Sequence, residues 1–260
     1  MLNKIIFTIV LFCSTVVNGS EVKEIFQSGS INWSDGTITA VGMGFSKKSN
    51  PIIAYKMAQR ASKLDAMRNI LEMIKHVKVD AKTTVKDKML ENDSINTSIS
   101  GYINNIVNVK YTKLDSHTVE ATIMIKMKDS LTLLVENSDT LNSAIFTGKK
   151  ATGLIIDASK LNFIPSLNPK LIQEFKGIIY PDNIFQKDSG SNQFVAIYLK
   201  NIEDAKKHPL VGAFPIVIQA KELYNNMNDQ IVLNKENSNK IINELKKEAL
   251  QNGKVIILLK

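Results

Sequence analysis

The longest regular pattern of apolar positions in the chain lies within residues 51–76. Apolar side chains recur there at steps of three and four residues, which is the spacing of one face of an α-helix. This apolar stripe consists of Ile53, Met57, Ala61, Leu64, Met67, Leu71 and Ile74. Asn50 is suited to cap such a helix, and Pro51 suits its first position, where the missing N–H costs nothing. The pattern predicts one long helix that begins at Pro51 and ends near His76.

Alternating apolar and polar positions predict strands before and after this helix. Residues 37–45, TITAVGMGF, are rich in β-branched residues and precede it. Three alternating runs follow in VKVDAKTTVKD, YINNIVNVKYT and TVEATIMIKMK, and LDSH between the last two is typical of a hairpin turn. The polar residues 20–36 are expected to form only a loosely held lead-in. The order β-α-β-β-β predicts an antiparallel sheet with the long helix across its apolar face.

The second half of the chain predicts a separate, smaller module. Short apolar runs indicate strands in TGLIIDA, FVAIYL, AFPIVIQA, QIVLN and KVIILL, and residues 236–251 have helical spacing with Gly253 as a stop signal. Residues 161–191 contain three prolines and few periodic positions, which indicates loops. The expected fold class is α+β, and the expected parts are an N-terminal β-α-β-β-β module at residues 37–128, a linker at 129–150 and a mixed α/β C-terminal module at 151–260.

Residues 1–19 have the pattern of a cleaved secretory signal. A positive start, the apolar core IIFTIVLF and the small-residue exit STVVNG fit cleavage before Ser20. This core is shorter than the ~20 residues of a membrane-spanning helix. The single cysteine, Cys13, lies in this segment, and the bulky Phe12 before it favours ordinary cleavage over lipidation. We therefore expect a periplasmic or outer-membrane-associated protein whose remaining chain has no thiol for a disulfide or a metal site.

The formal charge of +8 at pH 7 has two interpretations. In an exported protein, the natural anionic partners are lipid head groups, lipopolysaccharide or cell-wall polymer, and no nucleic acid is expected. The lysines are scattered and form no basic block, so a generally lysine-rich composition is the preferred interpretation.

The segment VGMGFS places Gly42 and Gly44 between a predicted strand and a predicted helix, as in a dinucleotide-binding fingerprint. The third glycine is absent, and six residues separate Gly44 from Pro51. The helix N-terminus is therefore poorly placed for a pyrophosphate. A close approach of the backbone to another element is the preferred interpretation, and no cofactor is expected.

The histidines and acids form no recognisable catalytic or metal-binding set. His76 ends the long helix, His117 lies in the hairpin turn and His208 precedes a proline. No pair has metal-ligand spacing, and neither HExxH nor GxSxG occurs. Asp157 ends a predicted strand, where a carboxylate can accept backbone N–H groups of the following turn. The sequence predicts no metal, cofactor or catalytic site.

Four charged residues interrupt the long helix: Arg60, Asp65, Arg68 and Glu72. Arg68 follows Asp65 by three positions and precedes Glu72 by four, so these three side chains can meet on one helix face. They are interpreted either as a solvated edge, where each ion pair contributes roughly a few tenths of a kcal/mol, or as a contact with another surface. The four residues are the candidate site, a helix-edge contact.

The same helix resembles a known family. The pattern A-x-R-A-x-x-x-D-A-x-R-x-x-L-E is carried by Ala58, Arg60, Ala61, Asp65, Ala66, Arg68, Leu71 and Glu72. Together with the following V-x-V and T-T-V, it resembles the Lpp-twenty lipoprotein family, whose members include flagellar envelope proteins. The resemblance covers about residues 37–127. TGLIIDA and GAFPIVIQA similarly resemble segments of longer, envelope-located members.

The resemblance implies a non-enzymatic structural or assembly role in the cell envelope, for example as a subunit of a ring or disc around the flagellar motor. Its implied partners are further copies of the chain or other envelope proteins. The alternative, suggested by the positive charge, is a periplasmic binding module for an anionic envelope polymer or lipid. An envelope hydrolase stands third, because it rests only on Asp157 and the histidines.

Overall fold

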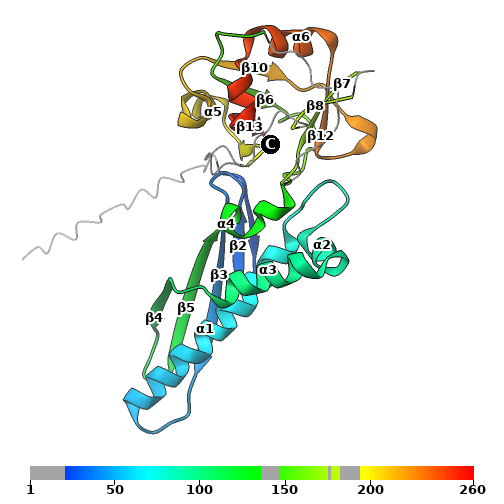
Figure 1. Cartoon of the computed structure of the whole chain (residues 1–260). Helices are drawn as coiled ribbons and strands as arrows, with labels where there is room; N and C mark the ends of the chain where they lie inside the picture. Colours follow the sequence, from blue (N-terminus) through cyan, green and yellow to red (C-terminus); the bar gives the residue numbers. More distant parts are fainter. Residues whose placement is uncertain (1–20, 136–146, 175–176, 182–193) are drawn as a thin grey trace, which may run out of the picture.

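The computed structural model describes residues 21–135, 147–174, 177–181 and 194–260 (Figure 1). The expected signal at residues 1–19, with Cys13, and part of the expected linker lie outside the described residues. An elongated N-terminal module lies end to end with a C-terminal module. None of the helices in the described residues combines the length and the hydrophobicity of a membrane span.

Five antiparallel strands form the sheet of the N-terminal module, in the order β1-β2-β3-β5-β4. Their bounds are β1 Lys23–Phe26, β2 Gly29–Asn32, β3 Thr37–Phe45, β4 Val109–Lys113 and β5 Thr118–Lys126. The central strands β3 and β5 pair along their full lengths. A long helix, α1 (Pro51–His76), lies across one face of this sheet. The predicted α+β architecture of this module is confirmed.

The ends of α1 follow the capping signals in the sequence. The side-chain oxygen of Asn50 accepts hydrogen bonds from the N–H groups of Ile52 at 3.0 Å and Ile53 at 3.2 Å, and Pro51 occupies the first helical position. His76 is the last residue of the helix, where a basic side chain suits the negative end of the helix dipole. The predicted extent of the helix is confirmed.

The face of α1 that packs on the sheet is not the predicted one. The buried positions are Ala54, Ala58, Ser62, Ala66, Ile70, Met73 and Ile74. Of these, only Ile74 belongs to the predicted stripe. Ile53, Met57 and Leu64, three larger members of that stripe, are exposed.

The reason is the close approach of α1 to β3. A Cβ atom on Gly44 would lie only 1.9 Å from the carbonyl oxygen of Ala58. A Cβ atom on Gly42 would lie 2.0 Å from the backbone nitrogen of Ala66. Only glycine in the strand and small residues on the helix fit such a contact, so the small-residue side of α1 faces the sheet. The interpretation of the two glycines as a close backbone approach is confirmed.

The N-terminal lead-in forms strands rather than a loosely held segment. β1 and β2 pair as a hairpin, and β2 continues onto β3 with Ile31 opposite Ile38. Ile31 and Trp33 are buried in the core. The prediction for residues 20–36 is wrong because a few apolar side chains in a polar segment are enough to fix its strands.

The strand predicted in VKVDAKTTVKD is also wrong. The Asp80 carboxylate accepts a hydrogen bond from the Thr83 N–H at 2.9 Å, which folds a turn. Thr84 and Asp87 then form a capping box at the start of helix α2 (Val85–Glu91). Side chains that bond to the local backbone override the alternating pattern here.

A third helix replaces the first part of another predicted strand. Helix α3 (Asp93–Asn104) includes the first residues of YINNIVNVKYT, and β4 begins only at Val109. Asn92 caps α3 by accepting the N–H of Ser94 at 2.9 Å. The hairpin predicted between the last two runs is confirmed as the connection between β4 and β5.

Two small sheets and short helices form the C-terminal module, which confirms its predicted mixed α/β class. The parallel sheet β10-β6-β13-β9 consists of β6 Gly153–Asp157, β9 Ile197–Leu199, β10 Pro215–Gln219 and β13 Val255–Leu258. The sheet β11-β12-β7-β8 consists of β7 Lys170–Gln173, β8 Gly177–Tyr180, β11 Glu222–Leu223 and β12 Gln230–Leu233. β7 and β8 lie in the stretch that the sequence indicates as loops.

The remaining helices are short. They are α4 Met127–Leu131, α5 Ile202–Lys207, α6 Lys235–Glu244 and α7 Lys247–Gln251, with 3-10 turns η1 Thr132–Leu134, η3 Pro209–Val211 and η4 Tyr224–Asn226. The single helix predicted at residues 236–251 is divided between α6 and α7. The division occurs because Leu245 and Lys246 form β-bridges with Ala151 and Gly148.

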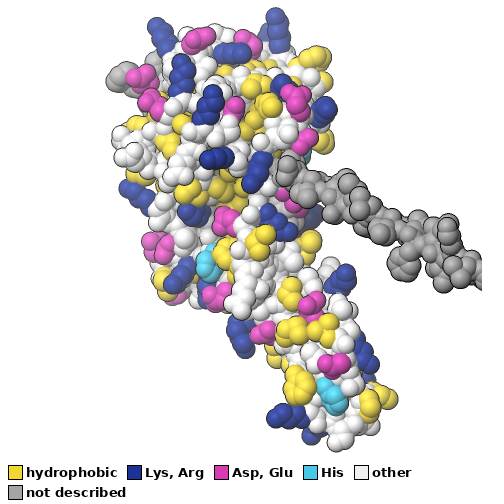
Figure 2. Space-filling view, turned by 180° about the vertical axis from the view of Figure 1, so that it is seen from behind, with side chains coloured by type: hydrophobic (Ala, Val, Ile, Leu, Met, Phe, Trp, Pro, Cys, Tyr) yellow, Lys and Arg dark blue, Asp and Glu magenta, His cyan; other side chains and the backbone are white. Residues whose placement is uncertain are grey.

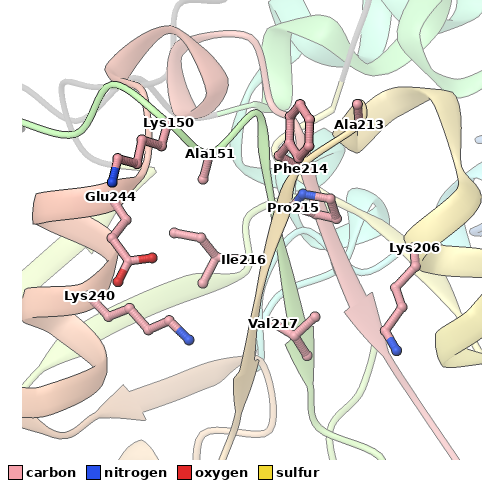
Figure 3. A pocket seen from close by; sticks show the side chains of 10 residues that line it. All are labelled: Lys150, Ala151, Lys206, Ala213, Phe214, Pro215, Ile216, Val217, Lys240 and Glu244. Carbon is pink, nitrogen blue, oxygen red and sulfur yellow. The ribbon is translucent and has the colours of Figure 1, made fainter.

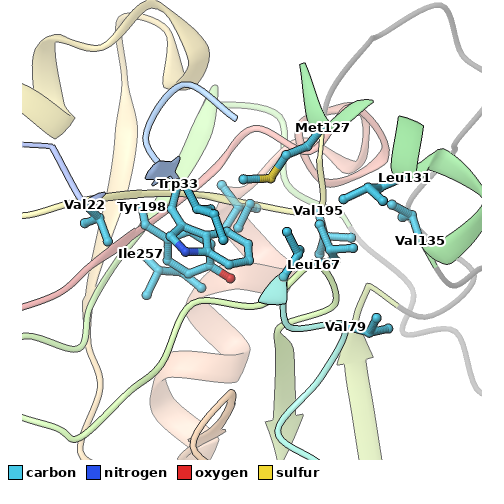
Figure 4. Packing of buried hydrophobic residues seen from close by; sticks show 14 of the residues in the cluster. Val22, Trp33, Val79, Met127, Leu131, Val135, Leu167, Val195, Tyr198 and Ile257 are labelled. Atoms are coloured by element: carbon cyan, nitrogen blue, oxygen red, sulfur yellow. The ribbon is translucent and has the colours of Figure 1, made fainter. Parts of the chain in front are cut away.

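The two modules share one continuous hydrophobic core (Figure 4). The rings of Trp33 and Tyr198 meet edge to face with their centroids 5.8 Å apart. The backbone N–H of Leu167 donates a hydrogen bond to the carbonyl of Lys78 at 2.9 Å. The junction is therefore a packed interface, not a bare linker.

Candidate functional site

The part of the N-terminal module farthest from the C-terminal module narrows to a finger (Figure 1). β2 pairs with β3 only as far as Ala40, so beyond that residue the sheet consists of β3, β5 and β4. We define the finger as residues 41–65 and 110–122. It contains the second half of β3, the first part of α1 and the β4–β5 hairpin.

Two side chains of α1 bond to the edge of β3 that β2 leaves open. Asp65 Oδ2 accepts a hydrogen bond from the backbone N–H of Met43 at 3.0 Å. The Asn69 side-chain amide donates to the carbonyl of Val41 at 2.7 Å. The two side chains take the place of a neighbouring strand, since edge groups otherwise need water or another chain as partner. Asp65 thus makes a contact between helix and strand within the chain.

The other charges of the candidate helix edge are more exposed. Arg68 Nη1 lies 3.5 Å from Asp65 Oδ1, and the Arg68 side chain is 73% exposed. The Glu72 carboxylate forms its ion pair with Lys75 at 2.8 Å. Arg60 is exposed and has no ion pair within the described part of the chain. The structure therefore brings Asp65 and Arg68 together, whereas Arg60 lies apart and Glu72 pairs with Lys75. A contact of these residues with another molecule stays a prediction.

An apolar surface on the finger was not anticipated. On α1, Ile53, Met57 and Leu64 are 49%, 46% and 64% exposed, and they follow one another along the outer face of the helix. On the opposite side of the finger, the outward residues Met43 and Phe45 of β3 are also exposed, as is Met124 on β5 just beyond the finger. Figure 2 shows hydrophobic side chains along the finger from behind. The sequence does contain a signal for this surface. Small residues recur every four positions from Ala54 to Ala66, and this second stripe is the one that packs against Gly42 and Gly44.

A groove of about 830 Å³ runs along β10, an edge strand of the parallel sheet (Figure 3). The exposed Phe214 and Val217 contribute apolar surface to it. Lys150, Lys206, Lys240 and Glu244 flank it. Lys206 also pairs with Glu203 at 2.9 Å, which reduces the positive charge available to a partner. The lining thus combines apolar surface with three lysines and one glutamate.

An enzymatic function would require Asp157 and the histidines to act together, but these residues lie in separate parts of the structure. Asp157 Oδ1 accepts hydrogen bonds from the N–H of Ser159 at 3.0 Å and from its hydroxyl at 2.6 Å. His117 contacts the carbonyl of Ser46 at the end of the finger. His208 accepts the N–H of Leu210 at 3.2 Å, and burial lowers the pKa of its imidazole. No group of three metal-ligating side chains occurs among the described residues.

A buried polar cluster at the module junction was missed by sequence reasoning. The carboxylate of Asp229 is buried and accepts a hydrogen bond from the Ser166 hydroxyl at 3.2 Å, while its Oδ1 has no hydrogen-bond partner among the described residues. The Tyr198 hydroxyl donates to the carbonyl of Ser166 at 2.7 Å. Burial raises the pKa of Asp229, and the nearby Asp80 raises it further. The cluster holds the loop around Ser166 against the N-terminal module, and only tertiary contacts identify it.

Comparison with protein-family models gives a match in the C-terminal module. Residues 153–260 match a protein-family model described as the second domain of Treponema pallidum Tp0624. The match relates this module to that domain by similarity. No curated protein matches the chain.

Proposed function

We propose that the protein is an exported, non-enzymatic structural or assembly component of the cell envelope. In this proposal the N-terminal module associates with further copies of the chain, or with other envelope proteins, through the outer face of α1. The resemblance of the long helix to the Lpp-twenty lipoprotein family supports the proposal, and a flagellum-associated ring or disc is its most specific form.

The single observation that carries the proposal is the apolar outer face of α1. Ile53, Met57 and Leu64 lie on a helix whose opposite face already packs on the sheet. This second apolar face is not buried within the monomer, and exposed apolar patches on a protein surface often mark interaction sites. Burying each of these partly exposed side chains against a partner would contribute roughly 1 kcal/mol. Several copies of the contact in a closed assembly would add to a stable structure.

Light scattering coupled to size exclusion tests the proposal directly. The purified protein should self-associate as its concentration rises, and Leu64→Ser should shift the equilibrium toward the monomer by about fivefold to tenfold. Leu90→Ser is a matched control, because Leu90 is at least as exposed, at 76% against 64% for Leu64, but lies on α2, outside the outer face of α1. A strict monomer at high concentration, or equal effects of the two variants, would contradict the proposal.

The flagellar form of the proposal needs a test in cells. A deletion strain of the source organism should lose motility, and tomography should show a flagellar motor without one of its rings or discs. Complementation with the Leu64→Ser variant should restore less of the structure than complementation with Leu90→Ser. Normal motility with an intact motor would remove the flagellar form and leave the general assembly role.

A further inference from the structure

The end of the finger, which we call the tip, carries four large exposed apolar side chains, one of which, Ile53, also belongs to the outer face of α1. We define the tip as residues 45–56 and 113–117. Phe45 at the end of β3 is 60% exposed, Ile52 in the first turn of α1 is 70% exposed, and Leu114 in the β4–β5 turn is 52% exposed. They come from three separate elements that meet at the point farthest from the C-terminal module (Figure 1).

Phe45, Ile52 and Leu114 stand on a fixed frame. The Ser46 N–H donates to the carbonyl of His117 at 3.0 Å, and the His117 ring nitrogen Nδ1 lies 2.9 Å from the Ser46 carbonyl oxygen. The ring of His117 also contacts that of Phe45, with centroids 6.3 Å apart. Asn50 caps α1 immediately before Ile52. The apolar side chains are thus held outward by hydrogen bonds between the loop and the hairpin.

Lysines surround these apolar residues. Lys47, Lys48, Lys56 and Lys113 all lie in the tip and are exposed. Lys113 lies over the ring of Tyr55 at 5.6 Å from its centroid. The one acidic residue of the tip is Asp115, whose carboxylate accepts the N–H groups of His117 at 2.7 Å and Thr118 at 2.8 Å. The tip therefore has an excess of positive charge around an apolar centre.

We infer that the tip binds the surface of a membrane that contains anionic lipids. Phe45, Ile52 and Leu114 would enter the boundary between head groups and acyl chains, and the lysines would remain at the lipid phosphates. Reversible binding of a soluble protein to a membrane combines these two contributions, apolar insertion and attraction of basic residues to anionic lipid. Lysine suits the rim, because its aliphatic stem can follow an apolar surface while the ammonium stays in water.

A lipid surface fits the tip better than a protein surface does. The apolar residues project from a narrow end, and four lysines outnumber the single carboxylate of Asp115 around them. A protein partner would offer fixed carboxylates to a few of these lysines, whereas a lipid surface offers phosphates to all of them at once. This membrane contact goes beyond the proposed assembly role and depends on it only for placing the protein in the envelope. Met57 and Leu64 of the outer face of α1 lie outside the tip and stay free for other copies.

Vesicle flotation with the purified protein tests the inference. We expect binding to vesicles of phosphatidylcholine and phosphatidylglycerol in equal parts, and about tenfold weaker binding to phosphatidylcholine alone. We test two double variants. Binding to the anionic vesicles should weaken about tenfold in Phe45→Ser/Leu114→Ser, which loses apolar contact. It should also weaken about tenfold in Lys47→Gln/Lys48→Gln, which loses attraction to the lipid phosphates. Circular dichroism establishes that the variants are folded, and their exposed side chains leave the core intact.

The controls make the same chemical changes elsewhere on the surface. Leu90→Ser removes an exposed leucine on α2, and the double variant Lys221→Gln/Lys235→Gln removes two exposed lysines in the C-terminal half. Both controls should bind vesicles like the parent protein. Equal binding to the two lipid compositions would overturn the inference, as would unchanged binding of the Phe45 and Leu114 variant or a loss in either control.

A further comparison distinguishes membrane binding by the tip from the self-association proposed above. Leu64→Ser, which weakens self-association under that proposal, should keep its preference for anionic vesicles. The tip variants should keep the association state of the parent protein. Binding to dextran sulfate tests a soluble polyanion as the alternative ligand. If the protein bound dextran sulfate as tightly as the vesicles, and Phe45→Ser/Leu114→Ser did not weaken that binding, the tip would be assigned to a soluble polyanion and the lipid inference would be overturned.

Discussion

Asp65 Oδ2 accepts a hydrogen bond from the backbone N–H of Met43 at 3.0 Å, so a helix side chain satisfies an open strand edge. The same carboxylate lies 3.5 Å from the exposed guanidinium of Arg68. The two contacts differ in kind. The first removes an unpaired donor from the edge of β3, while the second is an ion pair in water, where the attraction is small.

Replacing Asp65 should therefore cost more stability than replacing Arg68. We expect Asp65→Ala to lower the free energy of unfolding by about 1 kcal/mol, because it removes a charge-assisted hydrogen bond at a partly exposed site. Arg68→Ala should change it by less than about 0.5 kcal/mol, and the coupling between the two in a double-mutant cycle should be only a few tenths. Urea denaturation measures all four proteins. A coupling energy that exceeds the effect of Asp65→Ala would mean that the ion pair, not the strand edge, is the main contact.

The contact between α1 and β3 makes a second, stronger prediction. Gly44→Ala places a Cβ atom 1.9 Å from the Ala58 carbonyl oxygen, so the helix must move away from the sheet. We expect a loss of roughly 2–3 kcal/mol in the free energy of unfolding. Gly101→Ala is the control, since the residue is in α3 and, apart from its neighbours and the backbone of that helix, no described atom lies within 4 Å of the new Cβ. There alanine should stabilise by up to about 1 kcal/mol. Equal effects at both sites would contradict the close packing.

The same contact explains which parts of the structure the sequence could predict. The existence and limits of α1 follow from local signals, Asn50, Pro51 and the helical spacing. The buried face does not, because in the first half of this helix the small and the large apolar residues lie on different sides, and the choice between them depends on Gly42 and Gly44 in another element. The turn at Asp80 and the burial of Asp229 are further cases. Each depends on hydrogen bonds or neighbours that a hydrophobic pattern does not contain.

The pH dependence of stability should report the burial of Asp229. Burial raises the pKa of this carboxyl above its ordinary value of 3.8 in the folded protein, while a hydrogen bond from Ser166 opposes the shift in part. A carboxyl with a raised folded pKa favours the folded state fully below the unfolded pKa. This contribution is lost as the pH rises through the folded pKa.

Asp229→Asn removes that titration. The free energy of unfolding of the parent protein, measured relative to Asp229→Asn, should fall as the pH is raised from below 3.8 toward neutrality. Glu222→Gln, at an exposed position on β11, controls for the general loss of a carboxylate. A difference between parent and Asp229→Asn that is constant over this pH range would show that Asp229 does not titrate in a buried state.

The contact between Trp33 and Tyr198 predicts that the two modules unfold together. Trp33 is the only tryptophan and is buried at the junction, so its fluorescence reports the junction alone, whereas circular dichroism in the far ultraviolet reports all helices and strands. Because one core continues through both modules, the two signals should give the same urea midpoint. An earlier midpoint by fluorescence would mean that the modules separate before they unfold.

Tyr198→Phe should shift both of these transitions to the same extent. The Tyr198 hydroxyl donates to the carbonyl of Ser166 at 2.7 Å and accepts its N–H at 3.1 Å, and both groups are buried. Loss of the hydroxyl leaves two buried backbone groups unpaired, which should lower the free energy of unfolding by about 3 kcal/mol. Tyr224→Phe is the matched control, because Tyr224 is exposed and the same change there should have an effect near zero. If Tyr198→Phe shifted only the fluorescence transition, the junction would be a separate unit of folding, and the assembly surface on the finger would not depend on the C-terminal module for its stability.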